Sequence, residues 1–179
     1  MCIRDRRSAP PRASPQAAWR SGRCAPPTGI PASTAPLPAV EDVSQGEEIV
    51  REIIDRITAG PIDAVERALS GVDSVTVGGS PYLISTRNSY SGEPIAKATQ
   101  YGFEFFRSHG LEAYYHDYSW DGHEWRNVCA RQTGSVNPND IVIICAHIDD
   151  MPSAGAAPGA DDNGSGTAAV LLAASILKE

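Results

Sequence analysis

The chain has 179 residues, about one domain's worth, and its 41% hydrophobic and 21% charged residues are typical of a globular protein. The net charge of −7 argues against a nucleic-acid partner, because proteins that bind nucleic acids present a basic face. The sequence contains no apolar run of about 18 residues, the minimum for a transmembrane helix, so we expect no membrane span. Four cysteines are too few for a disulfide scaffold.

Charge and proline are distributed unevenly, which divides the chain near Val40. Residues 1–40 hold six arginines, one acidic residue and eight of the 14 prolines, whereas residues 41–179 carry 21 acidic residues against nine basic ones. Residues 1–40 show no helical or strand period, and they cannot bury enough apolar surface to offset their ordering entropy. We expect a disordered leader or a translation artefact there. A transit peptide is the alternative, because the segment is rich in arginine and serine and poor in acids.

Helical periodicity predicts three helices in the first half of the remaining sequence. A capping box at Ser44 precedes the first helix, and Gly60-Pro61 is expected to end it and to begin the second. Residues 73–91 are rich in Gly, Ser, Thr and Asn and are expected to be irregular. The third helix is expected over residues 93–109, with Gly110 as its C-terminal cap.

The period then changes to that of strands. Residues 112–120 and 123–132 are expected to form a hairpin around the turn signal Asp121-Gly122. The run IVIICA, residues 141–146, is continuously apolar, as expected of a strand that is covered on both faces. A long loop then leads to an apolar helix over residues 167–177. A buried strand, a loop and a buried helix in this order predict one side of an α/β sandwich.

The loop after IVIICA concentrates residue types that bind metals. It reads HIDDMPSAGAAPGADDNGSG, from His147 to Gly166, and holds one histidine and four aspartates. Histidine and carboxylates are the ligands of hydrolytic zinc sites, and ligands in α/β folds gather at the carboxyl ends of strands. Asp149 could hold the second ring nitrogen of His147 and so fix its tautomer. We therefore place the candidate site in this loop.

Three other interpretations fit parts of the same loop. The aspartates could simply cap the last helix, although capping leaves His147 unexplained. The spacing Gly164-x-Gly166 imitates a dinucleotide-binding fingerprint, but that motif requires a strand directly before it. Residues 161–166 imitate the start of a calcium loop, but position twelve would be Leu172 instead of the required glutamate, which excludes calcium binding of that type.

The segment HIDDMPSAGAAPGADDNGSGTAAVLLAASIL resembles the first metal-binding segment of the co-catalytic zinc aminopeptidases, peptidase family M28, of the bacterial leucyl aminopeptidase and aminopeptidase Y type. Residues 157–166 match the pattern of that family at every position. Two weaker likenesses lie upstream, at Asn127-Val128 and at Ser85-Thr86-Arg87. The resemblance covers residues 46–179, and the ten-residue loop is its specific part.

The resemblance implies a three-layer α/β/α sandwich around a mixed sheet and a centre with two zinc ions. His147 would be a terminal ligand of one zinc, and Asp162 would be the carboxylate that bridges both. Asp149 would support His147, and Asn163 would support the surroundings of the second metal, whereas Asp161 is not expected to be a ligand. The resemblance also implies a cis peptide bond between Asp162 and Asn163.

Other parts of the family's catalytic domain are expected outside this sequence. The general-base glutamate would lie beyond residue 179, so no catalytic residue is expected within the chain, and the chain alone is expected to be inactive. Residues 41–179 would form the N-terminal part of the catalytic domain. The strand that follows the last helix in the family inserts between the strand of Asn127 and that of Ile141, so we expect an unfilled slot there.

The expected parent protein is a two-zinc exopeptidase, an aminopeptidase that releases N-terminal residues from a peptide substrate with a metal-activated water. Carboxypeptidase or glutaminyl-cyclase chemistry on the same fold is one alternative. A non-catalytic receptor-type or protease-associated domain is the other. The resemblance favours an extracytoplasmic location, either secreted or periplasmic.

Overall fold

The structure is a computed structural model that describes residues 2–4, 43–120, 122–152 and 155–178. The expected leader, residues 1–40, therefore lies outside the described residues except for three of its members. Helices and small sheets alternate along the described chain, which confirms a mixed α/β class. The three-layer arrangement stays a prediction. No described helix is both long enough and apolar enough to cross a bilayer.

Three helices precede the main sheet: α1 (Val43–Arg56), α2 (Ala59–Leu69) and α3 (Glu93–Ser108). The expected boundary at Gly60-Pro61 is wrong, because α2 begins one residue earlier and takes this pair into its first turn. A proline is tolerated there, since the first N–H groups of a helix have no partner within it. The third helix confirms its prediction, and Gly110 follows it at φ 72°, the left-handed conformation of a C-terminal cap.

A short hairpin lies in residues 73–91, which the composition predicts to be irregular. Strands β2 (Val75–Val77) and β3 (Ser80–Tyr82) pair antiparallel there. Gly78 and Gly79 connect them at φ 62° and 77°, which is the conformation that a two-residue hairpin turn requires. The composition rule misses this hairpin because each strand has only three residues.

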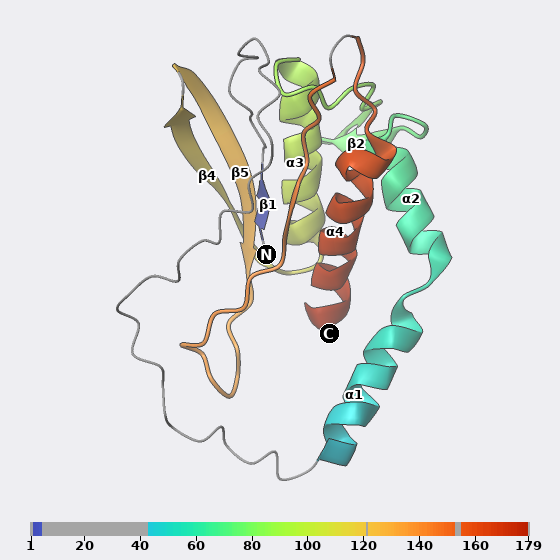
Figure 1. Cartoon of the computed structure of the whole chain (residues 1–179), viewed down its shortest axis with the longest axis vertical. Coiled ribbons are helices and arrows are strands. Elements are labelled where there is room, and N and C mark those ends of the chain that lie inside the picture. Colours follow the sequence, from blue (N-terminus) through green and yellow to red (C-terminus); the bar gives the residue numbers. More distant parts are fainter. Residues whose placement is uncertain (1, 5–42, 121, 153–154, 179) are drawn as a thin grey trace, which may run out of the picture.

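The main sheet has four strands in the order β4-β5-β1-β6. Strands β4 (Glu112–Trp120) and β5 (His123–Arg131) pair antiparallel along their whole length, which confirms the predicted hairpin. Strand β1 (Cys2–Arg4) runs antiparallel to β5 and parallel to β6 (Cys145–His147). Figure 1 shows β4, β5 and β1 side by side.

The slot that the resemblance implies exists, but it is not empty. Strands β5 and β6 are not neighbours, and β1 lies between them. Ile3 is opposite Val128 of β5 and opposite Ala146 of β6. The prediction of an unfilled slot is therefore wrong, because three residues from the start of the chain pair with both of its edges.

The predicted strand over residues 141–146 is wrong in its extent. Only its last two residues belong to β6, and the four before them are exposed, Ile141 by 84% and Val142 by 86%. A strand needs a neighbour along its length, and β1 reaches β6 only at residues 145–147. Within the described residues, the apolar run therefore lies largely uncovered.

Helix α4 (Ser165–Lys178) stands beside α3, and Figure 1 shows both on one side of the sheet. The helix begins two residues earlier than predicted. The core between these elements includes Ile148 and Ala168, which lie on either side of the long loop, so burial anchors both ends of the candidate site. The remaining buried core residues are Val65, Leu69, Ile84, Ala98, Phe106, Leu111, Val128, Ala130, Val170, Leu171 and Ala174.

Candidate metal centre

The loop between β6 and α4 starts and ends at neighbouring points of the fold. His147 is the last residue of β6, and a single wide turn, η1 (Ala160–Gly164), leads into α4. The hydroxyl of Thr167, in the first turn of α4, donates a hydrogen bond of 3.0 Å to the carbonyl of His147. Because Thr167 is fully buried, this bond fastens the start of the helix to the end of the strand.

His147 and Asp162 meet across this loop. The Nε2 atom of His147 lies 3.2 Å from Oδ1 of Asp162. The imidazole is mostly buried, whereas the carboxylate is 77% exposed and faces open space. A zinc ion bonds to nitrogen and oxygen ligands at about 2 Å, so a separation of this size suits two ligands of one ion. The predicted convergence is confirmed, and the role of the two residues as metal ligands stays a prediction.

Asp149 supports the ring of His147 through its backbone. The Nδ1 atom of His147 lies 2.8 Å from the carbonyl oxygen of Asp149 and 3.7 Å from its carboxylate. Since a carbonyl only accepts, Nδ1 carries a proton and donates to it, and Nε2 is the ring nitrogen that faces Asp162. The fully buried carboxylate of Asp149 instead accepts a hydrogen bond of 2.6 Å from the hydroxyl of Ser89. The expected contact exists, but the carbonyl makes it in place of the carboxylate.

Asn163 caps the helix that follows. Its Oδ1 accepts a hydrogen bond of 3.0 Å from the backbone N–H of Gly166. The peptide bond between Asp162 and Asn163 is cis, as the resemblance implies. Asp161 is exposed, and its carbonyl accepts a hydrogen bond from the hydroxyl of Ser165. Capping thus accounts for Asn163, and it leaves the meeting of His147 with Asp162 unexplained.

Arg87 is the residue of this region that sequence reasoning missed. Its side chain is fully buried, and its guanidinium donates to four backbone carbonyls at 2.5–2.7 Å. Burial lowers its pKa, while the nearby carboxylates of Asp150, Asp149 and Asp162 raise it. The one signal for Arg87 was the weak likeness of Ser85-Thr86-Arg87 to the family, because the residue pattern around it is that of an ordinary polar loop.

The centre is incomplete within the described part of the chain. No group of three or more His, Cys, Asp or Glu side chains gathers there in an arrangement that could hold a metal ion. His147 and Asp162 supply two donors, whereas zinc sites use three or four. The donor types fit a hydrolytic zinc centre, and further donors are needed to complete it.

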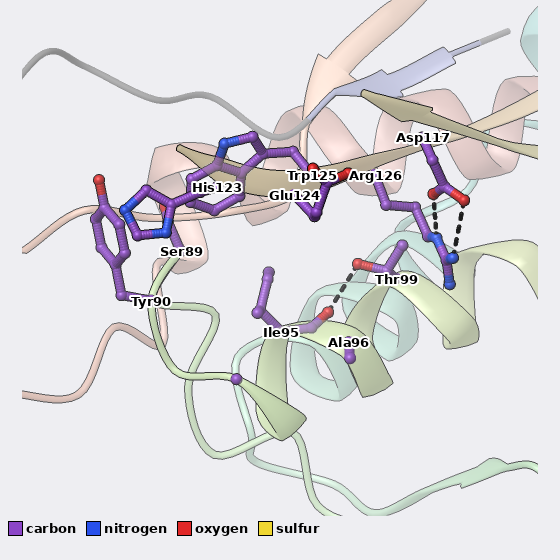
Figure 2. A pocket seen from close by; sticks show the side chains of 11 residues that line it. Ser89, Tyr90, Ile95, Ala96, Thr99, Asp117, His123, Glu124, Trp125 and Arg126 are labelled. Carbon is purple, nitrogen blue, oxygen red and sulfur yellow. Dashed lines mark hydrogen bonds and ion pairs between the residues drawn. The ribbon is translucent and has the colours of Figure 1, made fainter. Parts of the chain in front are cut away.

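A cavity of about 700 Å³ lies beside the centre, between the start of α3 and the tip of the β4–β5 hairpin. Figure 2 shows the rings of Tyr90, His123 and Trp125 along one end of this cavity. The ring centroid of Tyr90 lies 5.8 Å from that of His123 and 5.7 Å from that of Trp125. Ser89 lines the cavity and also bonds to Asp149, so the cavity and the candidate centre share a wall.

Comparisons with known proteins agree with this geometry. The family model described as peptidase family M28 matches residues 127–179. A probable aminopeptidase of Saccharomyces cerevisiae is 53% identical over 53 residues, which are 26% of this chain and 14% of the yeast protein. No solved structure matches the chain. Residues 127–179 thus match peptidase family M28, and the imidazole and carboxylate that converge at the end of β6 are donor types that hydrolytic metal sites use.

The matched segment contains the second half of β5, β6, the loop and α4, and therefore both predicted ligands. Arg87 and Ser89 lie outside it. The chain spans much less than two thirds of the length of the yeast relative.

Proposed function

We propose that this chain is part of a zinc-dependent aminopeptidase that removes N-terminal residues from peptides. The observation that carries the proposal is the approach of His147 Nε2 to Asp162 Oδ1, at 3.2 Å, at the end of a strand. The match of residues 127–179 to a peptidase family supports hydrolysis of a peptide bond. The similarity to a yeast protein described as a probable aminopeptidase favours an aminopeptidase over the other exopeptidases.

In this proposal His147 binds one zinc ion through Nε2, and the carbonyl of Asp149 keeps the opposite ring nitrogen protonated. Asp162 would be the ligand shared by two ions, and its high exposure leaves its carboxylate open to them. When bound, a pair of zinc ions activates a water molecule and polarises the scissile carbonyl. The remaining ligands and the general-base glutamate are assigned to sequence beyond residue 179, and the three-layer sandwich belongs to the same proposal.

Carboxypeptidase and glutaminyl-cyclase reactions on the same fold would use the same pair of ligands. A non-catalytic domain of receptor type would have no need for it. The positions of His147 and Asp162, with the ring tautomer held by Asp149, therefore favour a metal-binding role over a purely structural one.

Metal binding by the chain tests the ligand assignment directly. Zinc affinity is measured by competition with a chromophoric chelator for the unchanged chain and for His147→Ala, Asp162→Asn and Asp161→Asn. We expect weak binding that the first two substitutions abolish and that Asp161→Asn leaves unchanged. Equal loss in Asp161→Asn and Asp162→Asn would overturn the choice of Asp162 as the bridging ligand.

A chimera tests the catalytic part of the proposal. Residues 127–179 replace the corresponding segment of the yeast relative, which supplies the rest of a catalytic domain. We expect zinc-dependent release of leucine from leucyl-anilide, and its loss in the His147→Ala and Asp162→Asn chimeras. A peptide with a blocked N-terminus and a peptide with N-terminal glutamine test for carboxypeptidase and cyclase activity. If the two substituted chimeras hydrolyse leucyl-anilide as fast as the parent chimera, the proposed function is wrong.

A further inference from the structure

The guanidinium of Arg87 bonds to both ends of the loop between β6 and α4. We call residues 148–150 the first arm of this loop and residues 157–159 its second arm. On the first arm, Nε donates to the carbonyl of Ile148 at 2.7 Å. On the second arm, Nη1 donates to the carbonyl of Pro158 at 2.5 Å and Nη2 to that of Gly159 at 2.6 Å. A further bond from Nη1, to Leu69 at the end of α2, attaches the guanidinium to the body of the fold. One buried side chain thus holds three separate segments together.

The backbone around Arg87 adds ties to the same two arms. Its N–H donates to the carbonyl of Ala157 at 2.7 Å, and its carbonyl accepts from the N–H of Asp150 at 2.9 Å. The hydroxyl oxygen of Thr86 accepts from the N–H of Ala157 at 2.9 Å, and the N–H of Ser89 donates to the carbonyl of Asp150 at 3.0 Å. We call the segment from Thr86 to Ser89 the clamp.

The spacing of the two candidate ligands depends on where these arms are held. His147 directly precedes the first arm, and Asp162 lies in the turn η1 that directly follows the second arm. Ile148 and Gly159, which lie next to these ends, are both acceptors of Arg87. A guanidinium is planar and presents its donors in a rigid fork, so it fixes the separation of the carbonyls that it binds.

We propose that Arg87 is a positioning residue whose guanidinium holds the two loop arms at the separation at which His147 Nε2 meets Asp162 Oδ1. The effect on metal affinity rests on the proposed function, whereas the effect on the order of the loop does not. The proposal also explains why the side chain of a fully buried arginine donates to four backbone carbonyls, three of which belong to this loop.

If Arg87 only compensated the nearby negative charges, its replacement by lysine would have little effect, whereas a role in spacing the loop arms predicts a large one. Asp149, Asp150 and Asp162 surround Arg87, and a lysine at the same position would keep a positive charge beside them. A lysine ammonium is a compact point donor with three N–H groups and no planar fork, so it cannot reproduce the four bonds of the guanidinium or the spacing that they fix. Arg87→Lys therefore separates a role in spacing from a role in charge compensation.

The experiment compares hydrogen–deuterium exchange and zinc affinity in the full chain carrying Arg87→Lys. Two control variants are matched to it: Phe106→Leu destabilises the core in α3 away from the loop, and Arg131→Lys makes the same change at an exposed site. We expect exchange over residues 145–166 to quicken about tenfold or more in Arg87→Lys, because bonds from a charged donor are lost. Zinc affinity should fall about 10–100-fold, as for other residues that orient ligands.

Neither control should show this pattern, although Phe106→Leu should lower global stability. A fall in zinc affinity in Phe106→Leu equal to that in Arg87→Lys would reduce Arg87 to a structural role. Wild-type exchange and affinity in Arg87→Lys would overturn the proposal. The exchange measurement decides whether Arg87 positions the loop even if the unchanged chain binds too little zinc to measure, whereas the proposed function is decided by the chimera.

Thr86→Val keeps the test decisive should Arg87→Lys fail to fold. It removes two bonds that the Thr86 hydroxyl oxygen accepts, one from the N–H of Ala157 in the loop and one from the N–H of Asn88 in the clamp. We expect faster exchange at Asn88 and, within the loop, only over residues 155–166, with a smaller loss of zinc affinity. An unchanged exchange rate over residues 155–166 would contradict the inference that the clamp holds this part of the loop.

Discussion

The segments before and after strand β6 show the reverse of the usual pattern, in which apolar side chains are buried and charged side chains are exposed. Before the strand, Ile141 and Val142 are 84% and 86% exposed. After it, the carboxylate of Asp149 is buried, and so is Arg87, which bonds to the same stretch. Within ten residues the chain thus passes from exposed aliphatic side chains to the buried carboxylate of Asp149.

The difference shows that the availability of partners decides burial here. A buried polar group is tolerated when its hydrogen bonds are made, and Asp149 has the hydroxyl of Ser89 while Arg87 has four carbonyls. An aliphatic strand is buried only when another element covers it. In the described residues, β1 pairs with β6 only at positions 145–147, so the preceding isoleucines and valine gain little.

The largest effect is expected from a substitution at Gly159, in the hydrogen-bonded loop that follows β6. This residue has φ 53°, and a Cβ there would lie 2.5 Å from the carbonyl oxygen of Asp162 and 2.9 Å from Nη2 of Arg87. Gly159→Ala should cost roughly 1–2 kcal/mol for the left-handed backbone and about 1–3 kcal/mol for overlap. Gly155→Ala is the matched control, since Gly155 has φ 83° and open space around it, so only the backbone cost remains. Urea unfolding measures both, and equal losses would contradict the close packing at Gly159.

The bond between strand and helix should give an intermediate effect. Thr167→Val keeps the shape of the side chain but leaves the carbonyl of His147 without its buried donor, at a cost of about 1–3 kcal/mol. Thr99→Val is the same change at a buried threonine whose hydroxyl bonds within α3, to Ile95, where the helix already supplies a partner. We expect a smaller loss there. A cost at Thr99 as large as that at Thr167 would show that the bond to His147 has no special importance.

The smallest effect is expected from a substitution in the exposed apolar segment before β6. Val142→Lys replaces an 86% exposed aliphatic side chain, so the free energy of unfolding should change by no more than about 0.5 kcal/mol. Aggregation, followed by light scattering, should decrease because a charge interrupts an exposed apolar run. A loss of stability above about 1 kcal/mol would show that this segment packs against part of the protein. It would also remove the contrast between the segments before and after β6.

The sequence by itself determined the elements whose signals are local. The helix α3 and the β4–β5 hairpin followed from periodicity and from the turn residues between them, because residues close in sequence set these features. The residue types between His147 and Gly166 marked this loop as the candidate site, and the family resemblance of the segment implied that Asp162, rather than Asp161, lies with the histidine.

Only the tertiary structure decided what depends on partners far along the chain. The length of β6 follows from the three residues of β1 beside it, and no property of the apolar run reveals that neighbour. Arg87 bonds to carbonyls 61 to 72 positions further on, and backbone carbonyls leave no mark in a residue pattern. The carbonyl of Asp149 replaced its carboxylate at His147 for the same reason, because Ser89, 60 residues away, had already engaged the carboxylate.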